Sequence, residues 1–180
     1  SGCLQYPTGY LKAVREICNK HGILLIMDEV MSGFGRTGKF FGHEYAGIKP
    51  DVMVMAKGLA SGFPISAIAS TGEIMSKWQV GTHGGTYGGN AMGCAAAEAT
   101  LKVIKEEGLI ENAVQRGKQL MDGLAEIQSR FPVLGDVRGL GLMVGCEFTH
   151  PNTRQPNADI TKRVVKHALE DSHLILLTCG

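Results

Sequence analysis

The sequence lacks several features that mark whole classes of protein. Its 18 Lys and Arg nearly balance its 17 Asp and Glu, so no excess of one charge indicates nucleic-acid or membrane-surface binding. No apolar run approaches the ~20 residues of a membrane-spanning helix. The five cysteines are odd in number and form no CxxC pair, which argues against a disulfide framework or a zinc site. The six histidines lack metal-ligand spacing. We therefore expect no metal, no nucleic acid and no membrane partner.

The two ends of the chain also lack features of a complete protein. Residue 1 is Ser rather than an initiating Met, and the chain stops at Gly180 just after the apolar run 174–177. A missing initiating Met and a strand that stops with the chain both indicate truncation. We therefore expect that the complete protein continues beyond both ends of this sequence. The unpaired cysteines and near-neutral charge favour the cytoplasm, and only a targeting segment ahead of residue 1 would change that expectation.

Apolar strands alternate with helical patterns along the chain, which indicates the α/β class. The sequence predicts strands at 23–27, 51–55, 65–70 and 137–148, and the start of another at 174. It predicts helices at 10–20, 90–107, 109–130 and 158–172. The run 23–27 is apolar without alternation, which is typical of a strand buried on both faces of a parallel sheet.

Three chemically distinct residues lie where ligands bind in open α/β sheets, beyond the carboxyl ends of strands. Asp28 and Lys57 each follow a predicted strand, and Thr86 lies in the glycine-rich loop 81–89 before a helix. Alone, each is typical of a strand cap, a solvated lysine or an ordinary turn. Together they match pyridoxal 5'-phosphate (PLP), which needs a lysine for its aldehyde, a carboxylate for its pyridine nitrogen and N–H groups for its phosphate.

A phosphate-binding loop of the nucleotide-hydrolase type is a competing interpretation. Residues 33–39 satisfy GxxxxGK and follow a strand. However, Phe40 occupies the position where such a loop needs a Ser or Thr hydroxyl for magnesium. The acidic residues 28–29 also precede the loop, whereas hydrolases place theirs well after it. The sequence therefore disfavours a nucleotide hydrolase.

Three long segments carry a resemblance to a known family. Residues 24–67 (LLIMDEVMSGFGRTGKFFGHEYAGIKPDVMVMAKGLASGFPISA), 82–97 (THGGTYGGNAMGCAAA) and 137–148 (VRGLGLMVGCEF) resemble the class III aminotransferases, which are PLP enzymes of fold type I. The resemblance covers essentially the whole chain. It implies a large domain with a mostly parallel sheet and a small C-terminal α+β domain. We expect residues 1–108 in the PLP-binding large domain and residues 109–180 at the start of the small one.

The resemblance also implies roles for individual residues. Asp28 matches the aspartate that bonds the pyridine nitrogen, and Val30 the residue that packs on one face of the ring. Lys57 matches the Schiff-base lysine and is the expected catalytic residue. Thr86 matches the threonine that reaches the cofactor phosphate across a dimer interface, which implies a homodimer. Arg36 lies beside the expected site, with no catalytic step assigned to it.

The sequence departs from the family pattern at one position of the site. Many members have Gln three residues after the aspartate, where it bonds the phenolic oxygen of PLP, whereas this chain has Met31. The final LLTCG resembles the 4-aminobutyrate group of the family. The resemblance places a phosphate-binding segment and a stacking aromatic before Ser1, and a substrate-binding arginine after Gly180.

The resemblance predicts transamination, in which an amino group moves from an amino acid or ω-amino acid, of the 4-aminobutyrate type, to a 2-oxo acid. Two alternatives remain open from the sequence. One is a PLP-dependent decarboxylase or racemase of the same family. The other is a non-catalytic fragment, and we expect the isolated 180 residues to be inactive because cofactor-binding elements are missing.

Overall fold

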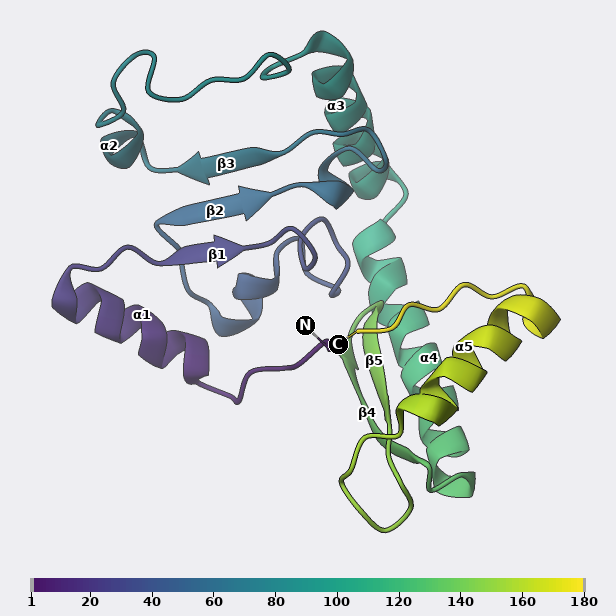
Figure 1. The fold of residues 1–180 in the computed structure, drawn as a ribbon. Coiled ribbons are helices and arrows are strands. Elements are labelled where there is room, and N and C mark those ends of the chain that lie inside the picture. The colour runs from purple at the N-terminus through teal and green to yellow at the C-terminus, as the bar shows by residue number, and fades with distance from the viewer. Residues whose placement is uncertain (1, 180) are drawn as a thin grey trace. The chain divides into compact units, whose positions relative to one another are not determined.

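The computed structural model describes residues 2–179 and divides the chain into two compact units. One unit is Tyr6–Val114. The other combines the residues up to Gln5 with those from Gln115 onward. Both units contain helices and strands, which confirms the α/β class (Figure 1). Within residues 2–179, no helix is both long and apolar enough to cross a membrane.

The unit Tyr6–Val114 is built on a small mixed sheet. Its strands are β1 (Ile26–Asp28), β2 (Val52–Met55) and β3 (Ala67–Ser70), in the spatial order β1-β2-β3. β1 and β2 run parallel, with Asp28 opposite Val54, while β3 runs antiparallel to β2 (Figure 1). The parallel arrangement that the sequence predicts thus holds for the first pair of strands, and the carboxyl ends of β1 and β2 meet at one edge.

Helical elements flank this sheet in sequence and end at recognisable caps. They are α1 (Tyr10–His21), η1 (Gly42–Ala46), η2 (Lys57–Leu59), α2 (Gly72–Met75) and α3 (Ala91–Glu106). α1 ends where Gly22 adopts the left-handed conformation that glycine tolerates, with φ 64°. α3 begins after Asn90, whose side chain accepts a hydrogen bond from the Gly93 N–H at 2.7 Å.

Burial around β1 differs from the prediction. The Asp51 carboxylate holds the start of this strand by accepting hydrogen bonds from Leu25 N at 2.7 Å and Arg15 Nη1 at 2.6 Å. Leu25 is buried, but Ile23, Leu24 and Ile26 are exposed. The expectation of a strand buried on both faces is therefore wrong here. The reason is that face burial requires helices packed over the sheet, and no helix among residues 2–179 packs extensively against β1.

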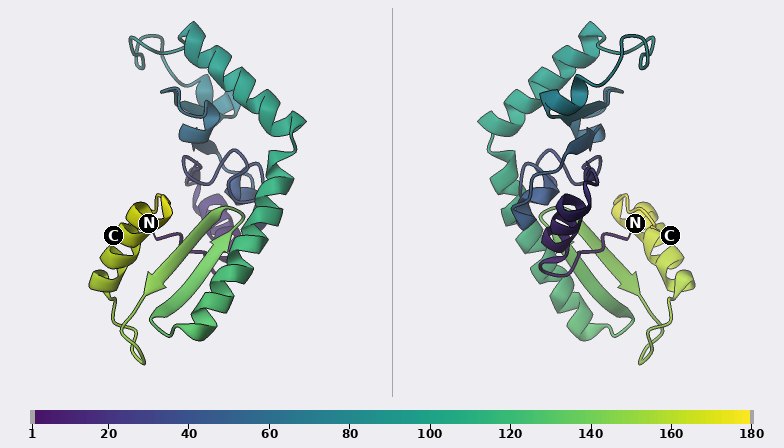
Figure 2. Two further views of the ribbon diagram at one scale, coloured as in Figure 1. Left: turned by 90° about the vertical axis from the view of Figure 1, so that its right-hand side faces the viewer. Right: turned by 90° about the vertical axis from the view of Figure 1, so that its left-hand side faces the viewer.

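The second unit combines helices with a β-hairpin. α4 (Leu109–Arg130) begins in the first unit and is followed by β4 (Leu134–Leu140), β5 (Met143–Phe148) and α5 (Ala158–Ser172). β4 and β5 pair antiparallel, and the hairpin lies between α4 and α5 in both views of Figure 2. Arg138 secures the N-terminal segment by donating from Nη2 to the Gly2 carbonyl at 2.8 Å, and it also pairs with Glu147 at 3.0 Å.

The strand predicted from residue 174 onward is not present. α5 closes when the Leu174 N–H bonds to the Ala168 carbonyl at 2.8 Å, and residues 173–179 have no regular structure. Leu177 is 86% exposed. A strand needs a neighbour to satisfy its backbone groups, and no strand among residues 2–179 pairs with this apolar run. Its apolarity alone does not make it a strand.

Candidate active site

The parallel pair β1/β2 brings an acid and an amine to the same edge of the sheet. Asp28 is the last residue of β1, and Lys57 follows β2 at the start of η2. Lys57 lies three residues beyond Val54, the register partner of Asp28, which corresponds to ~10 Å along an extended chain. Both side chains are exposed. The structure therefore confirms that the two predicted site residues share one edge.

Lys57 has an unusual backbone conformation. Its φ is +44°, in the left-handed region that residues other than glycine rarely adopt. Such conformations cost about 1–3 kcal/mol and cluster at functional sites. Among residues 2–179 the Lys57 ammonium group forms no ion pair, and its Nζ contacts the Met31 sulfur. A weak thioether acceptor leaves this amine free to react with a carbonyl group.

Asp28 is held by a local turn and keeps an oxygen available. Its Oδ1 accepts a hydrogen bond from the Val30 N–H at 2.9 Å, which forms a short side-chain turn directly after β1. Val30 itself is half-buried and Met31 is 55% exposed. The second carboxylate oxygen of Asp28 has no bond within residues 2–179. This oxygen can face a cationic nitrogen such as that of a protonated pyridine.

Thr86 lies in a different loop from Asp28 and Lys57. It occupies an exposed loop that turns through the Gly88 N–H to Gly85 carbonyl bond, 3.1 Å long, just before α3. No hydrogen bond within residues 2–179 joins Thr86 to Asp28 or Lys57. Its assignment to the cofactor phosphate stays a prediction, as does the ring-packing role of Val30.

The structure adds a residue to which the sequence analysis gave no role. Glu29 is completely buried and accepts four hydrogen bonds. Its Oε2 accepts from Ser32 Oγ at 2.5 Å and Gly42 N at 2.9 Å, and its Oε1 accepts from the His43 N–H at 2.8 Å and contacts His43 Nδ1 at 2.9 Å. Burial raises the pKa of Glu29, but these bonds together outweigh burial and hold the pKa below its ordinary value.

A pattern in the sequence could have revealed this role. Asp28 and Glu29 are neighbours, and successive side chains of a strand point to opposite faces. Of two adjacent carboxylates at a strand end, only one can therefore face the site. The other must be buried or solvated on the reverse side, and here the 32–43 segment covers it.

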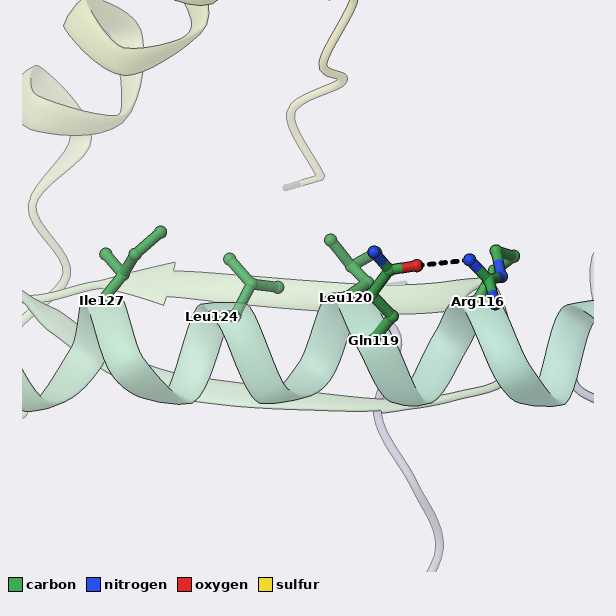
Figure 3. A pocket seen from close by; sticks show the side chains of 6 residues that line it. Arg116, Gln119, Leu120, Leu124 and Ile127 are labelled. Atoms are coloured by element: carbon green, nitrogen blue, oxygen red, sulfur yellow. Dashed lines mark hydrogen bonds between the residues drawn. The ribbon is translucent and has the colours of Figure 1, made fainter.

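An open hollow in the structure belongs to a different element. It has a volume of about 430 Å³ and lies on one face of α4, where Leu120, Leu124 and Ile127 line it (Figure 3). Its one charged group, Arg116, donates to Gln119 Oε1 at 2.7 Å. An open apolar hollow with no acid, base or nucleophile offers no catalytic chemistry, so we place the candidate site at the strand ends.

The donor set at the strand ends fits PLP. A lysine without a carboxylate partner suits an aldehyde, and a carboxylate with one free oxygen suits a pyridinium nitrogen. The thioether of Met31 offers no hydrogen to the phenolic oxygen. Within residues 2–179, no group of three or more His, Cys, Asp or Glu side chains is arranged to hold a metal ion.

Comparisons with known proteins agree with this chemistry. The family model described as "Aminotransferase class-III" matches residues 1–180. 5-Aminovalerate aminotransferase DavT of Pseudomonas putida is 45% identical over 99% of the chain, and 4-aminobutyrate aminotransferase GabT of Escherichia coli is 43% identical over 95% of it. The chain spans only 42% and 40% of the lengths of these two relatives.

A solved structure has the same fold. The crystal structure of a Bacillus anthracis aminotransferase superimposes with a TM-score of 0.89 at 42% identity, covering 97% of this chain and 40% of the other. This agreement extends over both units and supports the fold predicted from the three sequence segments.

Proposed function

The chain belongs to the class III aminotransferases, a PLP-dependent family of fold type I, and on that premise we propose that the complete protein is a transaminase. It would move an amino group from an amino acid or ω-amino acid to a 2-oxo acid. The observation that carries this proposal is the unpaired, strained Lys57 at the same sheet edge as Asp28. The relatives named for 5-aminovalerate and 4-aminobutyrate support a donor whose amino group is remote from its carboxylate.

Each residue of the proposed site has a distinct task. PLP, when bound, supplies an electron sink for the carbon that carries the substrate amino group. Asp28 keeps a proton on the pyridine nitrogen by placing a negative charge beside it. Lys57 holds the cofactor covalently through Nζ before substrate enters. As a neutral amine, Lys57 would then take the proton from the substrate carbon that bears the amino group and return it to the former aldehyde carbon of the cofactor, across the nitrogen. Val30 packs against the ring.

The proposal includes two domains and a homodimer. We assign residues 1–108 to the cofactor-binding domain and residues 109–180 to the start of the small domain. Thr86 would bond the phosphate of the site in the other subunit, which is consistent with its exposed loop. A cytoplasmic location is also part of the proposal, supported by the free cysteines Cys3, Cys18, Cys94, Cys146 and Cys179.

Lys57 is tested by chemical trapping in the complete protein loaded with PLP. Borohydride should fix the cofactor to the peptide that contains Lys57, as read by mass spectrometry. Lys57→Ala should abolish both the trapping and the visible absorbance of the lysine-bound cofactor, because no other amine occupies this position. Lys39→Ala is the matched control and should change neither signal. Trapping at full yield in Lys57→Ala would refute the assignment.

The reaction itself is tested by product analysis. We expect a donor screen with pyruvate and 2-oxoglutarate to show ping-pong kinetics and an oxo product that keeps its carboxylate. Release of carbon dioxide, or racemisation without an acceptor, would replace transamination with decarboxylation or racemisation.

Thr86 is tested by subunit mixing. Lys57→Ala and Thr86→Ala subunits should each be impaired alone. If Thr86 serves the neighbouring subunit, a mixed dimer contains one intact site, formed by Lys57 of one variant and Thr86 of the other. Activity should then reappear on mixing. If mixed dimers form and activity does not recover, Thr86 acts within its own subunit or not at all.

A further inference from the structure

Glu29 is a buried charge that the proposed chemistry does not use. Its backbone N–H bonds to the Val54 carbonyl at 2.9 Å, so the residue is fixed to β2 as well as to the end of β1. Its carboxylate receives four hydrogen bonds, all from Ser32, Gly42 and His43. A buried charge persists only when it is so compensated. The segment 32–43 is therefore tied at both ends to one carboxylate.

Close backbone contacts tighten the same connection. The Gly33 N–H bonds to the Glu29 carbonyl at 2.9 Å, and a Cβ at Gly33 would lie only 2.7 Å from that oxygen. A Cβ at Gly42 would lie 3.2 Å from Glu29 Oε2 and 3.1 Å from the Ser32 Cβ. Only glycine allows the segment to lie this close to Glu29 at Gly33.

Aromatic rings connect the residues that bond Glu29 to the segment that contains Lys57. Phe41 stacks on the His43 ring with centroids 5.8 Å apart, and its edge contacts Phe34, 5.6 Å away. Phe34 itself lies against Gly58, where an added Cβ would be 3.0 Å from the Phe34 Cβ. Gly58 directly follows Lys57. A continuous series of contacts thus runs from the Glu29 carboxylate to Gly58, the residue next to Lys57.

Phe34 shares the unusual conformation of Lys57. Its φ is +60° and that of Lys57 is +44°, and both are left-handed conformations that a residue with a Cβ does not adopt without support. The two residues are linked through the Phe34 side chain, which lies against Gly58, the residue after Lys57. Relief of either strain would let Lys57 return to an ordinary conformation and redirect its side chain.

We propose that Glu29 is a positioning residue for Lys57: by holding Ser32 and His43, its carboxylate keeps Phe34 pressed against Gly58 and so maintains the left-handed backbone that aims the Lys57 amine. The positions of these groups are observed in the structure and do not depend on the proposed function. The consequence for catalysis rests on the proposed function, in which Lys57 carries the cofactor.

A negative charge is required for this role. A glutamine at position 29 has the size of the glutamate but turns an amide NH₂ toward two of its donors, which leaves buried donors without acceptors. The lowered pKa of Glu29 agrees with a carboxylate that stays ionised at neutral pH. Glu44→Gln gives a matched control, because Glu44 is exposed and accepts one hydrogen bond, from Phe41 N at 2.7 Å, which the glutamine oxygen can still accept.

The test measures amide hydrogen exchange at Leu59 and Ala60 in the complete protein without cofactor. These N–H groups bond to the Ala56 and Lys57 carbonyls at 3.0 and 3.4 Å, so their protection reports the turn that holds Lys57. Glu29→Gln and Phe34→Ala should each speed exchange at both amides by about tenfold or more. Glu44→Gln should leave both rates unchanged, and Phe34→Leu, which keeps an apolar group against Gly58, should recover part of the protection.

The loaded enzyme provides a second readout. Glu29→Gln should lower kcat by about 10–100-fold with little change in KM, since misplacing a reacting group by ~1 Å costs about this much. If Glu29→Gln loosens the 32–43 segment but leaves the Leu59 and Ala60 amides unchanged, Glu29 is only structural and the proposal is wrong.

Two further outcomes are distinguishable. If Glu29→Gln fails to fold, Ser32→Ala and Phe34→Ala decide the matter, because they interrupt the same series of contacts while the Glu29 carboxylate keeps its bonds from Gly42 and His43. If the unsubstituted protein shows no cofactor trapped on Lys57, the proposed function fails, while the exchange rates still decide the positioning role.

Discussion

Two glycines of α4 provide a sharp test of the packing in the second unit. An alanine at Gly117 would place its Cβ 2.2 Å from the Gly141 carbonyl oxygen and 2.7 Å from the Gly141 Cα, in the turn between β4 and β5. An alanine at Gly123 would contact nothing within 4 Å. The two substitutions make the same chemical change in the same helix, so their difference isolates the contact with the hairpin.

The two substitutions should change the free energy of unfolding in opposite directions. Replacing glycine by alanine inside a helix stabilises it by about 1 kcal/mol, so Gly123→Ala should raise the free energy of unfolding by that amount. At Gly117 the same gain is opposed by overpacking, which costs about 1–3 kcal/mol. The contacts at Gly117 are with rigid backbone atoms at distances that real Cβ atoms do not reach, which places the cost at the upper end. We expect a net loss of about 2 kcal/mol.

Urea denaturation of the complete protein, followed by far-UV circular dichroism, measures both changes. The two variants should differ by about 3 kcal/mol, which is well above the uncertainty of the extrapolation. Equal stabilities of Gly117→Ala and Gly123→Ala would refute the close approach of α4 to the hairpin turn.

Two other predictions concern the first unit. The Leu25 N–H and then Arg15 lower the pKa of Asp51 below its ordinary 3.8, so its contribution to stability is complete above that value and is lost as the pH falls through the lowered folded pKa. Asp51→Asn should therefore flatten the acid limb of the stability profile, and an unchanged limb would contradict this bonding. Asn90→Ala removes the acceptor for Gly93 N and should cost about 1 kcal/mol of unfolding free energy, whereas Asn90→Asp, which keeps an acceptor, should cost far less.

Several features of the fold followed directly from the sequence. The limits of α4 and α5 agree with the predicted helices, because apolar residues recur at helical spacing over many turns and breakers or caps mark the ends. The meeting of Asp28 and Lys57 also followed, because parallel strands end at the same edge. The strands predicted at 51–55 and 65–70 and the helices predicted at 10–20 and 90–107 are also present, whereas the single strand predicted over 137–148 is wrong, because this segment folds back on itself as the antiparallel pair β4 and β5.

Other features depended on neighbours that a local pattern does not contain. The apolar run 23–27 predicted a strand buried on both faces, yet only its last two residues belong to β1, and Ile23 and Ile26 are exposed. The run from residue 174 predicted a strand and remains irregular, since strand formation requires a partner. An apolar sequence shows that a segment can be buried, but whether it is buried depends on the elements that pack against it.

The sequence by itself determined the family and the cofactor class, because these depend on residue types in a fixed order, and it predicted which acid and which amine form the site. The tertiary structure decided how the amine is held. Strict strand alternation ends at Met55, so the direction of Lys57 depends on its left-handed backbone and on Phe34 against Gly58. That contact joins residues 24 positions apart, and in our proposal Glu29 anchors it. No local sequence pattern specifies the contact, because Phe34 and Gly58 come together only when the chain folds.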